Sequence, residues 1–588
     1  MAVSRVRMCL VCLFAALPLL AQPAIFPLKD VRPGMHGVGK TVFSGSKVEE
    51  FQVDILGVLE NVGPRQSIIL ARLSGGPLDK TGVLQGMSGS PVYIDGKLAG
   101  AVAMAFSFAK EPIAGIRPIE EMLRAGSLPG VARDARPVAL SPGNALKTVA
   151  LPREEYAAGQ THLIDIATPL FLGGFTRAAV QHFSPRLREL GLEPVQGAAG
   201  GGGSSDRMGN PAHLQPGSMI SVELVSGDLN VSADGTVTCI DGKRLYAFGH
   251  RFLAAGSTDL PFARADVLAL LPNLSSSFKI SVSRELMGSI TQDRSTAVAG
   301  VLGQRAALVP VLISVNGSEP TAYRLRMVND RMLSPLLLQM AVFSAVDATE
   351  RSIGASSFRV RGRLEFQGQT GPVRLDNMYA GDANTALQVS LGVAIPASYA
   401  LQSGFSALRL KDVSLSIDAY ERKDQFQIDQ VWTSRREVRP GESVDLTVVL
   451  EGQNGREISK TVTYKVPIGA PLGTLYFTVA DGNTTNLTEF QQLVSEPART
   501  PAQVVDLLNA LRDNTNAYVR VWRPDAGYQV QGLDFPSPPP SVALILAREQ
   551  PTPGNLLVAR SSKVTELAVS AGNAVINGSQ TVQIEVKE

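Results

Sequence analysis

The chain has 588 residues, which is enough for two to four domains, each with a buried core of its own. Its 55 Lys and Arg residues against 53 Asp and Glu leave a formal net charge of +2. It therefore lacks the basic excess by which proteins bind polyanions, and we expect no nucleic-acid partner. The 55 Gly and 37 Pro residues, with 6% aromatic residues, indicate many short strands joined by turns, so we expect a mainly β protein.

Residues 1–21 have the three-part layout of a secretory signal peptide. Arg5 and Arg7 precede an apolar run from Met8 to Leu20, and small residues surround Ala21. This run is too short for a normal membrane span, and no later run reaches about 18 uncharged apolar residues. We therefore predict an exported protein, periplasmic or extracellular, with no membrane span after the signal is cleaved.

The cysteines limit the chemistry that the exported chain can use. Cys9 and Cys12 lie in the predicted signal peptide, which leaves Cys239 as the one cysteine of the mature chain. A single cysteine excludes an intramolecular disulfide and a cysteine-based zinc site. We expect neither a metal nor a cofactor.

A glycine-framed serine stands inside the first segment, residues 25–130, whose short apolar runs separated by turns are typical of strands. In Gly-Met-Ser-Gly-Ser-Pro, Gly86 and Gly89 bracket Ser88. Glycine allows the backbone to take positive φ or to turn its N–H groups inward. Two apolar runs about Asp95-Gly96 follow at once and predict a β-hairpin. The pattern is that of a nucleophile mounted at the entrance of a strand.

A glycine-rich linker, residues 197–205, separates this segment from a second one, residues 217–303. There two strand-like runs about Asp241-Gly242 lead into Ala-Phe-Gly-His250. Both segments contain Ile-Asp-Gly-Lys, which has two interpretations. In the first, two hairpins use the same favourable turn. In the second, two similar β-units face each other, one presenting Ser88 and the other His250.

The last third of the chain has a different pattern of apolar and polar residues. Residues 405–485 alternate apolar and polar positions between turns, which suits an immunoglobulin-like β-sandwich without the cysteines of antibody domains. Thr500-Pro-Ala-Gln503 is a capping box, and it predicts a helix from Pro501 to Asn514. We therefore expect a small α+β segment over residues 486–588.

A serine hydroxyl becomes a useful nucleophile only beside a base and near N–H groups that hold the developing oxyanion. His250, after a strand and a glycine, is the best candidate base, and the backbone N–H groups of Gly86 and Ser88 are the natural oxyanion donors. A triad also needs a group that orients the imidazole. Three carboxylates are candidates for that third member, and each has a surface or turn-capping role as the alternative. They are Asp79, Asp228 and Asp259.

The serine motif resembles the nucleophile motif of the SpoIVB family of bacterial serine peptidases, which belong with the chymotrypsin-like double-barrel proteases. The resemblance extends to Asp30–Gly45 upstream and to Ala247–Phe252, which is similar to the family's histidine segment. It implies a SpoIVB-like peptidase domain over residues 22–385, a chymotrypsin-like double β-barrel. Two departures stand out: no acid aligns upstream of the serine motif, and here the serine precedes the histidine.

The leading hypothesis is thus an exported serine endopeptidase of SpoIVB type that cleaves a protein substrate in the cell envelope. The alternative is a catalytically inactive scaffold or binding protein of the envelope that keeps the protease fold. In either case the β-sandwich could bind an envelope protein partner. The first hypothesis requires Ser88 and His250 to converge in the folded chain.

Overall fold

The computed structural model describes residues 24–106, 108–127, 155–158, 161–197, 207–273, 276–349, 353–493, 500–525, 527–530, 533–535, 538–548, 556–559 and 561–588. The predicted signal peptide lies outside the described residues, as does the predicted linker apart from residue 197. Strands make up 54% of the structure and helices 19%, which confirms a mainly β protein.

Six antiparallel strands close into a first β-barrel. Its strand order is β4-β1-β2-β3-β6-β5, and β5 pairs back to β4. The first core forms because alternate residues of these strands point inward, as Phe51, Val53 and Ile55 do along β2. The strands are β1 (His36–Val42), β2 (Val48–Gly63), β3 (Gln66–Ser74), β4 (Pro91–Ile94), β5 (Lys97–Phe106) and β6 (Ile113–Pro118).

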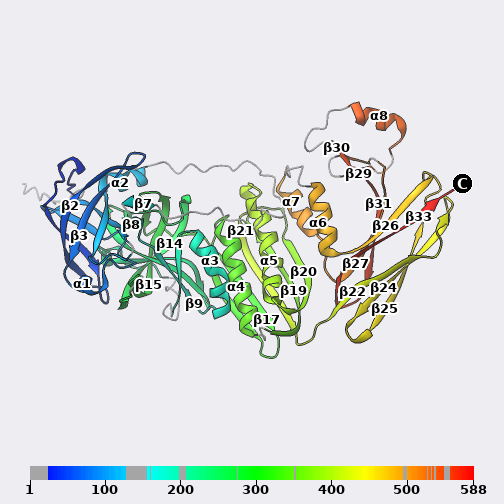
Figure 1. The fold of residues 1–588 in the computed structure, drawn as a ribbon, viewed down its shortest axis with the longest axis horizontal. Helices are drawn as coiled ribbons and strands as arrows, with labels where there is room; N and C mark the ends of the chain where they lie inside the picture. Colours follow the sequence, from blue (N-terminus) through cyan, green and yellow to red (C-terminus); the bar gives the residue numbers. More distant parts are fainter. Residues whose placement is uncertain are drawn as a thin grey trace, which may run out of the picture.

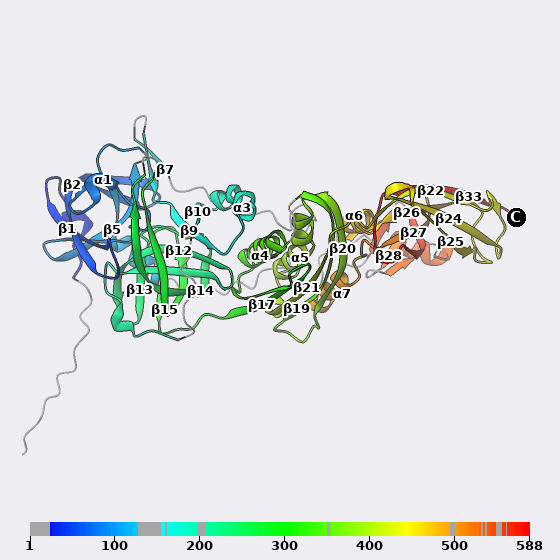
Figure 2. The same ribbon diagram turned by 90° about the horizontal axis from the view of Figure 1, so that it is seen from below.

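A second barrel follows with the same connectivity. Its ring is β12-β13-β16-β15-β14-β11, closed by the pairing of β11 with β12. In both barrels, counted along the chain, the third strand pairs with the sixth and the fourth with the first. The predicted double barrel is therefore confirmed, and Figures 1 and 2 show the two barrels side by side at one end of an elongated molecule. The strands are β11 (Met219–Gly227), β12 (Asn230–Asp241), β13 (Arg244–Ala247), β14 (Gly256–Leu271), β15 (Phe278–Arg294) and β16 (Ala297–Leu302).

Shorter elements extend the two barrels. In the first, β8 and β7 continue the sheet from β5; in the second, β9 and β10 continue it from β12. These strands are β7 (Glu155–Ala158), β8 (Thr161–Asp165), β9 (Thr168–Gly173) and β10 (Leu192–Gln196). Helices α1 (Leu78–Thr81) and α2 (Ile119–Ser127) flank the hairpins of the first barrel, and α3 (Arg177–Glu189) joins β9 to β10.

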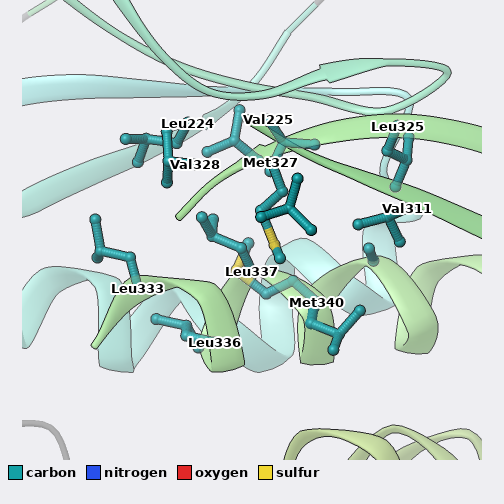
Figure 3. Close-up of a cluster of buried hydrophobic side chains, with 14 of the residues drawn as sticks. Leu224, Val225, Val311, Leu325, Met327, Val328, Leu333, Leu336, Leu337 and Met340 are labelled. Carbon is teal, nitrogen blue, oxygen red and sulfur yellow. The ribbon is translucent and has the colours of Figure 1, made fainter. Parts of the chain in front are cut away.

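The sheet of the second barrel continues from β11 into five further strands that are covered by helices. The order is β18-β17-β21-β19-β20. In α4 (Leu333–Thr349), Leu333, Leu337 and Met340 point toward side chains of β11, β17 and β18, as Figure 3 shows. The remaining elements of this region are β17 (Leu308–Asn316), β18 (Thr321–Val328), β19 (Ile353–Phe366), β20 (Val373–Ala383), α5 (Thr385–Gln402) and β21 (Leu410–Tyr420).

A two-sheet sandwich forms the other end of the molecule (Figure 1). One sheet has the order β25-β24-β22-β32 and the other β23-β33-β26-β27-β31, and both contribute to one apolar core. Its strands are β22 (Gln425–Thr433), β23 (Glu437–Val438), β24 (Ser443–Gly452), β25 (Glu457–Lys465), β26 (Gly473–Asp481), β27 (Asn516–Arg523), β31 (Ser562–Ser570), β32 (Val575–Asn577) and β33 (Ser579–Val586).

The boundaries of this sandwich differ from those expected. It begins at β22, one strand later than residue 405, because β21 pairs with β17 and β19 in the long sheet. It also takes four strands from residues 486–588, which were expected to form a separate segment. That region adds α6 (Gly482–Leu493), α7 (Pro501–Asn509) and a small sheet with a projecting helix, made of β28 (Gly527–Val530), β29 (Leu533–Phe535), α8 (Pro540–Arg548) and β30 (Leu556–Ala559).

Helix α7 joins the sandwich to the rest of the chain. It begins with the predicted capping box of Thr500 and Gln503 and ends at Asn509, five residues before the expected end. Val504, Val505 and Leu508 are buried in the core that also contains α4 and α5. Within the part of the chain that the structure describes, no helix is both long and apolar enough to cross a membrane.

Candidate active site

Ser88 and His250 occupy equivalent loops of the two barrels. Ser88 lies between β3 and β4, the third and fourth strands of the first barrel. His250 lies between β13 and β14, the third and fourth strands of the second. Ser88 and His250 are therefore carried by different barrels at the same point of the same topology.

Thr236, on β12, connects the two loops across the barrel interface. Its N–H donates to the carbonyl of Ser88 at 2.9 Å, and its own carbonyl accepts the N–H of Phe248 at 3.3 Å. Its hydroxyl donates to the carbonyl of Gly86 at 2.8 Å. The structure thus brings the serine loop against the turn that leads into His250.

The serine loop has the backbone conformation that an oxyanion hole needs. Gly86 and Gly89 have φ of 88° and 92°, in the left-handed region that favours glycine. Within the described ranges, no residue accepts a hydrogen bond from the N–H of Gly86 or of Ser88, although both residues are buried. Buried N–H groups are nearly always paired, so two neighbouring exceptions beside a serine mark a place for a negatively charged atom.

The hydroxyl of Ser88 is buried and also lacks a hydrogen-bond partner in the described part of the chain. Ser88 is 0% exposed, and its Oγ has no hydrogen-bond partner among the residues that the structure describes. Ser90, two residues on, is also fully buried, but its Oγ donates to Thr41 Oγ1 at 3.0 Å. The two serines of the motif therefore have different environments: the hydroxyl of Ser88 has no partner among the described residues, and that of Ser90 is hydrogen-bonded.

His250 is the one buried histidine of the five, at 2% exposure. Its Nδ1 lies 2.7 Å from the carbonyl of Arg251. Because a carbonyl only accepts, Nδ1 carries the proton of the neutral ring, and Nε2 is the nitrogen that can take up a proton. Phe248 and Gly249 both have φ of 71°; for Phe248 this backbone conformation is strained, and such strain collects at functional sites.

Two buried charged residues hold the histidine loop, and neither was predicted from the sequence. Asp293, at the end of β15, accepts the N–H groups of Phe252 at 2.8 Å, Leu253 at 2.7 Å and Ala255 at 3.1 Å. Burial raises the pKa of Asp293, while these three hydrogen bonds act in the opposite direction. Arg117, from β6 of the first barrel, donates to the carbonyl of Gly249 at 3.4 Å.

The three carboxylates proposed as the third triad member have other surroundings. Asp79 is exposed on α1. Asp228 lies in the β11–β12 turn and accepts the N–H of Arg324 at 2.6 Å. Asp259, on β14, accepts Ser289 Oγ at 2.6 Å and the N–H of Ala307 at 2.8 Å. Asp228 and Asp259 thus tie strands together, and the carbonyl of Arg251 takes the place beside Nδ1.

A cleft of about 750 Å³ opens next to the serine loop. It is lined by residues from α1 to Gln85, by parts of β5, β6 and β10, and by the turn before β15. Gln85, three residues before Ser88, lines it and donates to Ser276 Oγ at 2.7 Å. Across the described ranges there is no cluster of three or more His, Cys, Asp or Glu side chains that could hold a metal ion.

The comparison with protein families identifies the first barrel. Residues 24–123 match the family model for the SpoIVB peptidase S55. A search of curated proteins and a search of solved structures each gave no match. The matched residues cover the whole first barrel and half of α2, and they end well before His250. The segment that carries Gly-Met-Ser88-Gly-Ser-Pro is therefore similar to the SpoIVB peptidase S55 family.

Proposed function

We propose that the protein is an exported serine endopeptidase of SpoIVB type, with Ser88 as nucleophile and His250 as general base. The family match supports a serine peptidase, and a peptidase implies a protein substrate. The observation that carries the proposal is the serine loop itself. Its unpaired hydroxyl lies beside two unpaired buried N–H groups, and Thr236 ties the loop to the turn before His250.

The proposed reaction is an acyl transfer. His250 Nε2 takes the proton of Ser88 Oγ as that oxygen attacks the carbonyl carbon of the scissile bond, while the carbonyl of Arg251 holds the Nδ1 proton. The N–H groups of Gly86 and Ser88 receive the negative oxygen of the tetrahedral intermediate. His250 then gives its proton to the leaving amine, and water repeats the sequence to release the acyl group.

The cleft beside Gln85 is the route that we assign to the substrate. It reaches the loop from the side of α1 and the turn before β15. Ser88 itself is fully buried, so a peptide gains access to Oγ only when chain around it moves aside. This burial is also the observation that favours the alternative, an envelope scaffold that retains the protease fold without turnover.

Labelling with a fluorophosphonate separates these two functions. The full chain is incubated with the probe, digested and mapped by mass spectrometry. The peptidase proposal requires an adduct on Ser88 that is lost in His250→Ala. An adduct on another residue contradicts the assignment of the nucleophile, and an unlabelled protein that cleaves no casein favours the scaffold.

Export is proposed from residues 1–21 alone. Expression of the full chain in a bacterium, followed by fractionation and N-terminal sequencing, tests it. We expect mature protein outside the cytoplasm, beginning just after Ala21. Full-length protein confined to the cytoplasm would contradict export.

Asp293→Asn should slow the reaction at Ser88 by about 100-fold, the size of effect expected when a catalytic group is displaced by about 1 Å. An amide has one acceptor oxygen, whereas the carboxylate uses both of its oxygens for three N–H donors of the histidine loop. The measurement is the rate of labelling. Asp228→Asn is the matched control, because Asp228 also accepts a backbone N–H, but from Arg324 on β18 and not from the histidine loop. Equal rates for the two variants would show that Asp293 does not position His250.

Removal of everything after residue 424 should preserve labelling at Ser88 but lower the melting temperature. Both barrels and β21 remain, whereas α7 is lost together with the burial of Val504, Val505 and Leu508. Each such side chain contributes about 1.5–3 kcal/mol when fully buried. A chain that ends at residue 400 should instead aggregate, because β21 is then missing from between β17 and β19. Size-exclusion chromatography and labelling of both fragments check this, and equal behaviour would contradict the boundary.

A further inference from the structure

A lysine of the second barrel reaches into the first barrel behind the serine loop. Lys279, on β15, is 0% exposed, and its Nζ donates to Thr41 Oγ1 on β1 at 2.8 Å. The same Thr41 Oγ1 accepts Ser90 Oγ at 3.0 Å. The ammonium group is therefore connected through one hydroxyl to the residue that follows Ser88 and Gly89.

The other end of the serine loop also rests on Lys279. The N–H of Lys279 donates to the carbonyl of Gln85 at 3.3 Å. A Cβ built on Gly86 would lie 3.4 Å from Lys279 Cδ, so the stem of the lysine is in contact with that glycine. Lys279 thus contacts the loop before Ser88 through its backbone N–H and its stem, and reaches the residue after Gly89 through Thr41, next to the N–H groups that would bind an oxyanion.

The charge on Lys279 is costly to bury and has one charged neighbour. Burial lowers the pKa of Lys279 to about 7, and the negative charge of Asp234 on β12 acts in the opposite direction. Burial likewise raises the pKa of Asp234 to about 6; Asp234 accepts a hydrogen bond from Ser281. The other groups facing the lysine, Thr41 and Ser90 from the first barrel and its register partner Leu270 on β14, are uncharged.

We propose that Lys279 is a positioning residue of the serine site, which fixes the Gly86–Ser90 loop and places a positive charge behind its oxyanion-binding N–H groups. The inference rests on the function proposed above for Ser88. An apolar side chain would fill the same space without the desolvation of an ammonium group, so the buried charge points to a functional demand. The positive charge would stabilise the negative oxygen of the tetrahedral intermediate.

The positioning half of the proposal is tested without catalysis, by hydrogen exchange on the full chain. Thr41→Val keeps the shape of the side chain but removes the hydroxyl that joins Lys279 to Ser90, whereas Thr41→Ser retains it. In Thr41→Val we expect the hydrogen-bonded amides of Met87, Gly89 and Ser90 to exchange at least about tenfold faster, with residues 250–255 unchanged. Thr41→Ser should match the wild type. Unchanged protection of these three amides in Thr41→Val would overturn the proposal.

The electrostatic half is tested by the pH dependence of labelling at Ser88. In the wild type the rate should fall on the alkaline side as Lys279 loses its charge near pH 7. Lys279→Met should lack this alkaline fall and should have a maximum lower by about tenfold, less than the 10²–10³-fold effect of removing an oxyanion-hole donor. Lys97→Met, at the exposed first residue of β5, is the matched control and should follow the wild type.

Three outcomes decide the matter. A Lys279→Met profile that keeps the alkaline fall overturns the electrostatic role, because another group then causes it. If Lys279→Met does not fold, Lys279→Met with Asp234→Asn removes both buried charges together and should show the same loss of the alkaline fall. If the wild type is not labelled at any pH, the proposed function of Ser88 fails, and the exchange rates of the Thr41 variants still decide whether Lys279 holds the loop.

Discussion

Ser88→Ala should abolish fluorophosphonate labelling and proteolysis and leave the fold unchanged. Loss of a nucleophile of this type lowers turnover by about 10⁴-fold or more. Stability should be retained because Ser88 Oγ has no hydrogen-bond partner within the described chain, so the substitution removes a buried hydroxyl without orphaning another group. The measurements are the labelling rate and the urea-unfolding midpoint of both proteins.

Ser90→Ala is the control for this prediction. Ser90 Oγ donates to Thr41, so its removal should cost about 1 kcal/mol of stability and slow labelling without abolishing it. If Ser90→Ala abolished labelling while Ser88→Ala remained reactive, Ser90 would be the nucleophile. If neither variant changed labelling, the probe would be reacting elsewhere.

Gly89→Ala should have the largest effect on folding. Its φ of 92° is unfavourable for alanine, and the added Cβ would lie 2.1 Å from the carbonyl oxygen of Thr236 and 2.5 Å from the nitrogen of Phe248. Both are backbone atoms of the second barrel, so the two barrels must separate locally to admit the methyl group. We expect a loss of more than about 4 kcal/mol, in the exceptional range for one substitution, or failure to fold.

Gly96→Ala separates backbone strain from steric overlap. Gly96 has a similar φ of 74° in the β4–β5 turn, but a Cβ there would meet nothing within 4 Å. The expected loss is therefore that of the left-handed conformation alone, about 1–2 kcal/mol. Unfolding midpoints of the two variants check this, and equal losses would show that the barrels are not packed tightly at Gly89.

Local turn chemistry is what made the serine loop predictable. Gly86, Gly89 and the Asp95-Gly96 pair specify backbone conformations that depend on a few neighbouring residues, and the structure has positive φ at all four. Ile-Asp-Gly-Lys shows the limit of the same reasoning. It lies in the hairpin of the fourth and fifth strands in the first barrel but of the second and third in the second barrel. The motif is therefore one turn used twice, although two matching barrels do face each other.

Residues buried by long-range packing could not be predicted in this way. Along β15, alternation predicts that Phe278, Ile280 and Val282 face inward, yet Lys279 and Ser281 between them are the more buried residues. Lys279 contacts Thr41 of the first barrel, and Ser281 donates to Asp234 on β12. Both partners are far away in the sequence. Asp293 was not predicted either, because a carboxylate between two strand-like runs has the appearance of a turn residue.

The domain boundary was missed for a different reason. Alternation identifies a half-buried strand but not the sheet that it joins, so β21 was assigned to the sandwich although it pairs with β17 and β19. The four strands that return from the end of the chain to complete the sandwich are likewise a matter of topology. Neither the sheet that a strand joins nor the return of strands from the end of the chain can be recognised in a short window of sequence.

The shared strand order of the two barrels has a consequence for how a site between them can evolve. Duplication of one six-stranded unit is enough to generate both halves, because Ser88 and His250 lie in the same loop of their respective copies. A site between two such copies receives side chains from both, and its chemistry depends on the positions of these side chains and not on their order in the chain. Either copy can therefore carry the nucleophile while the other carries the base. Two genes that encode the copies in opposite order would produce the same site.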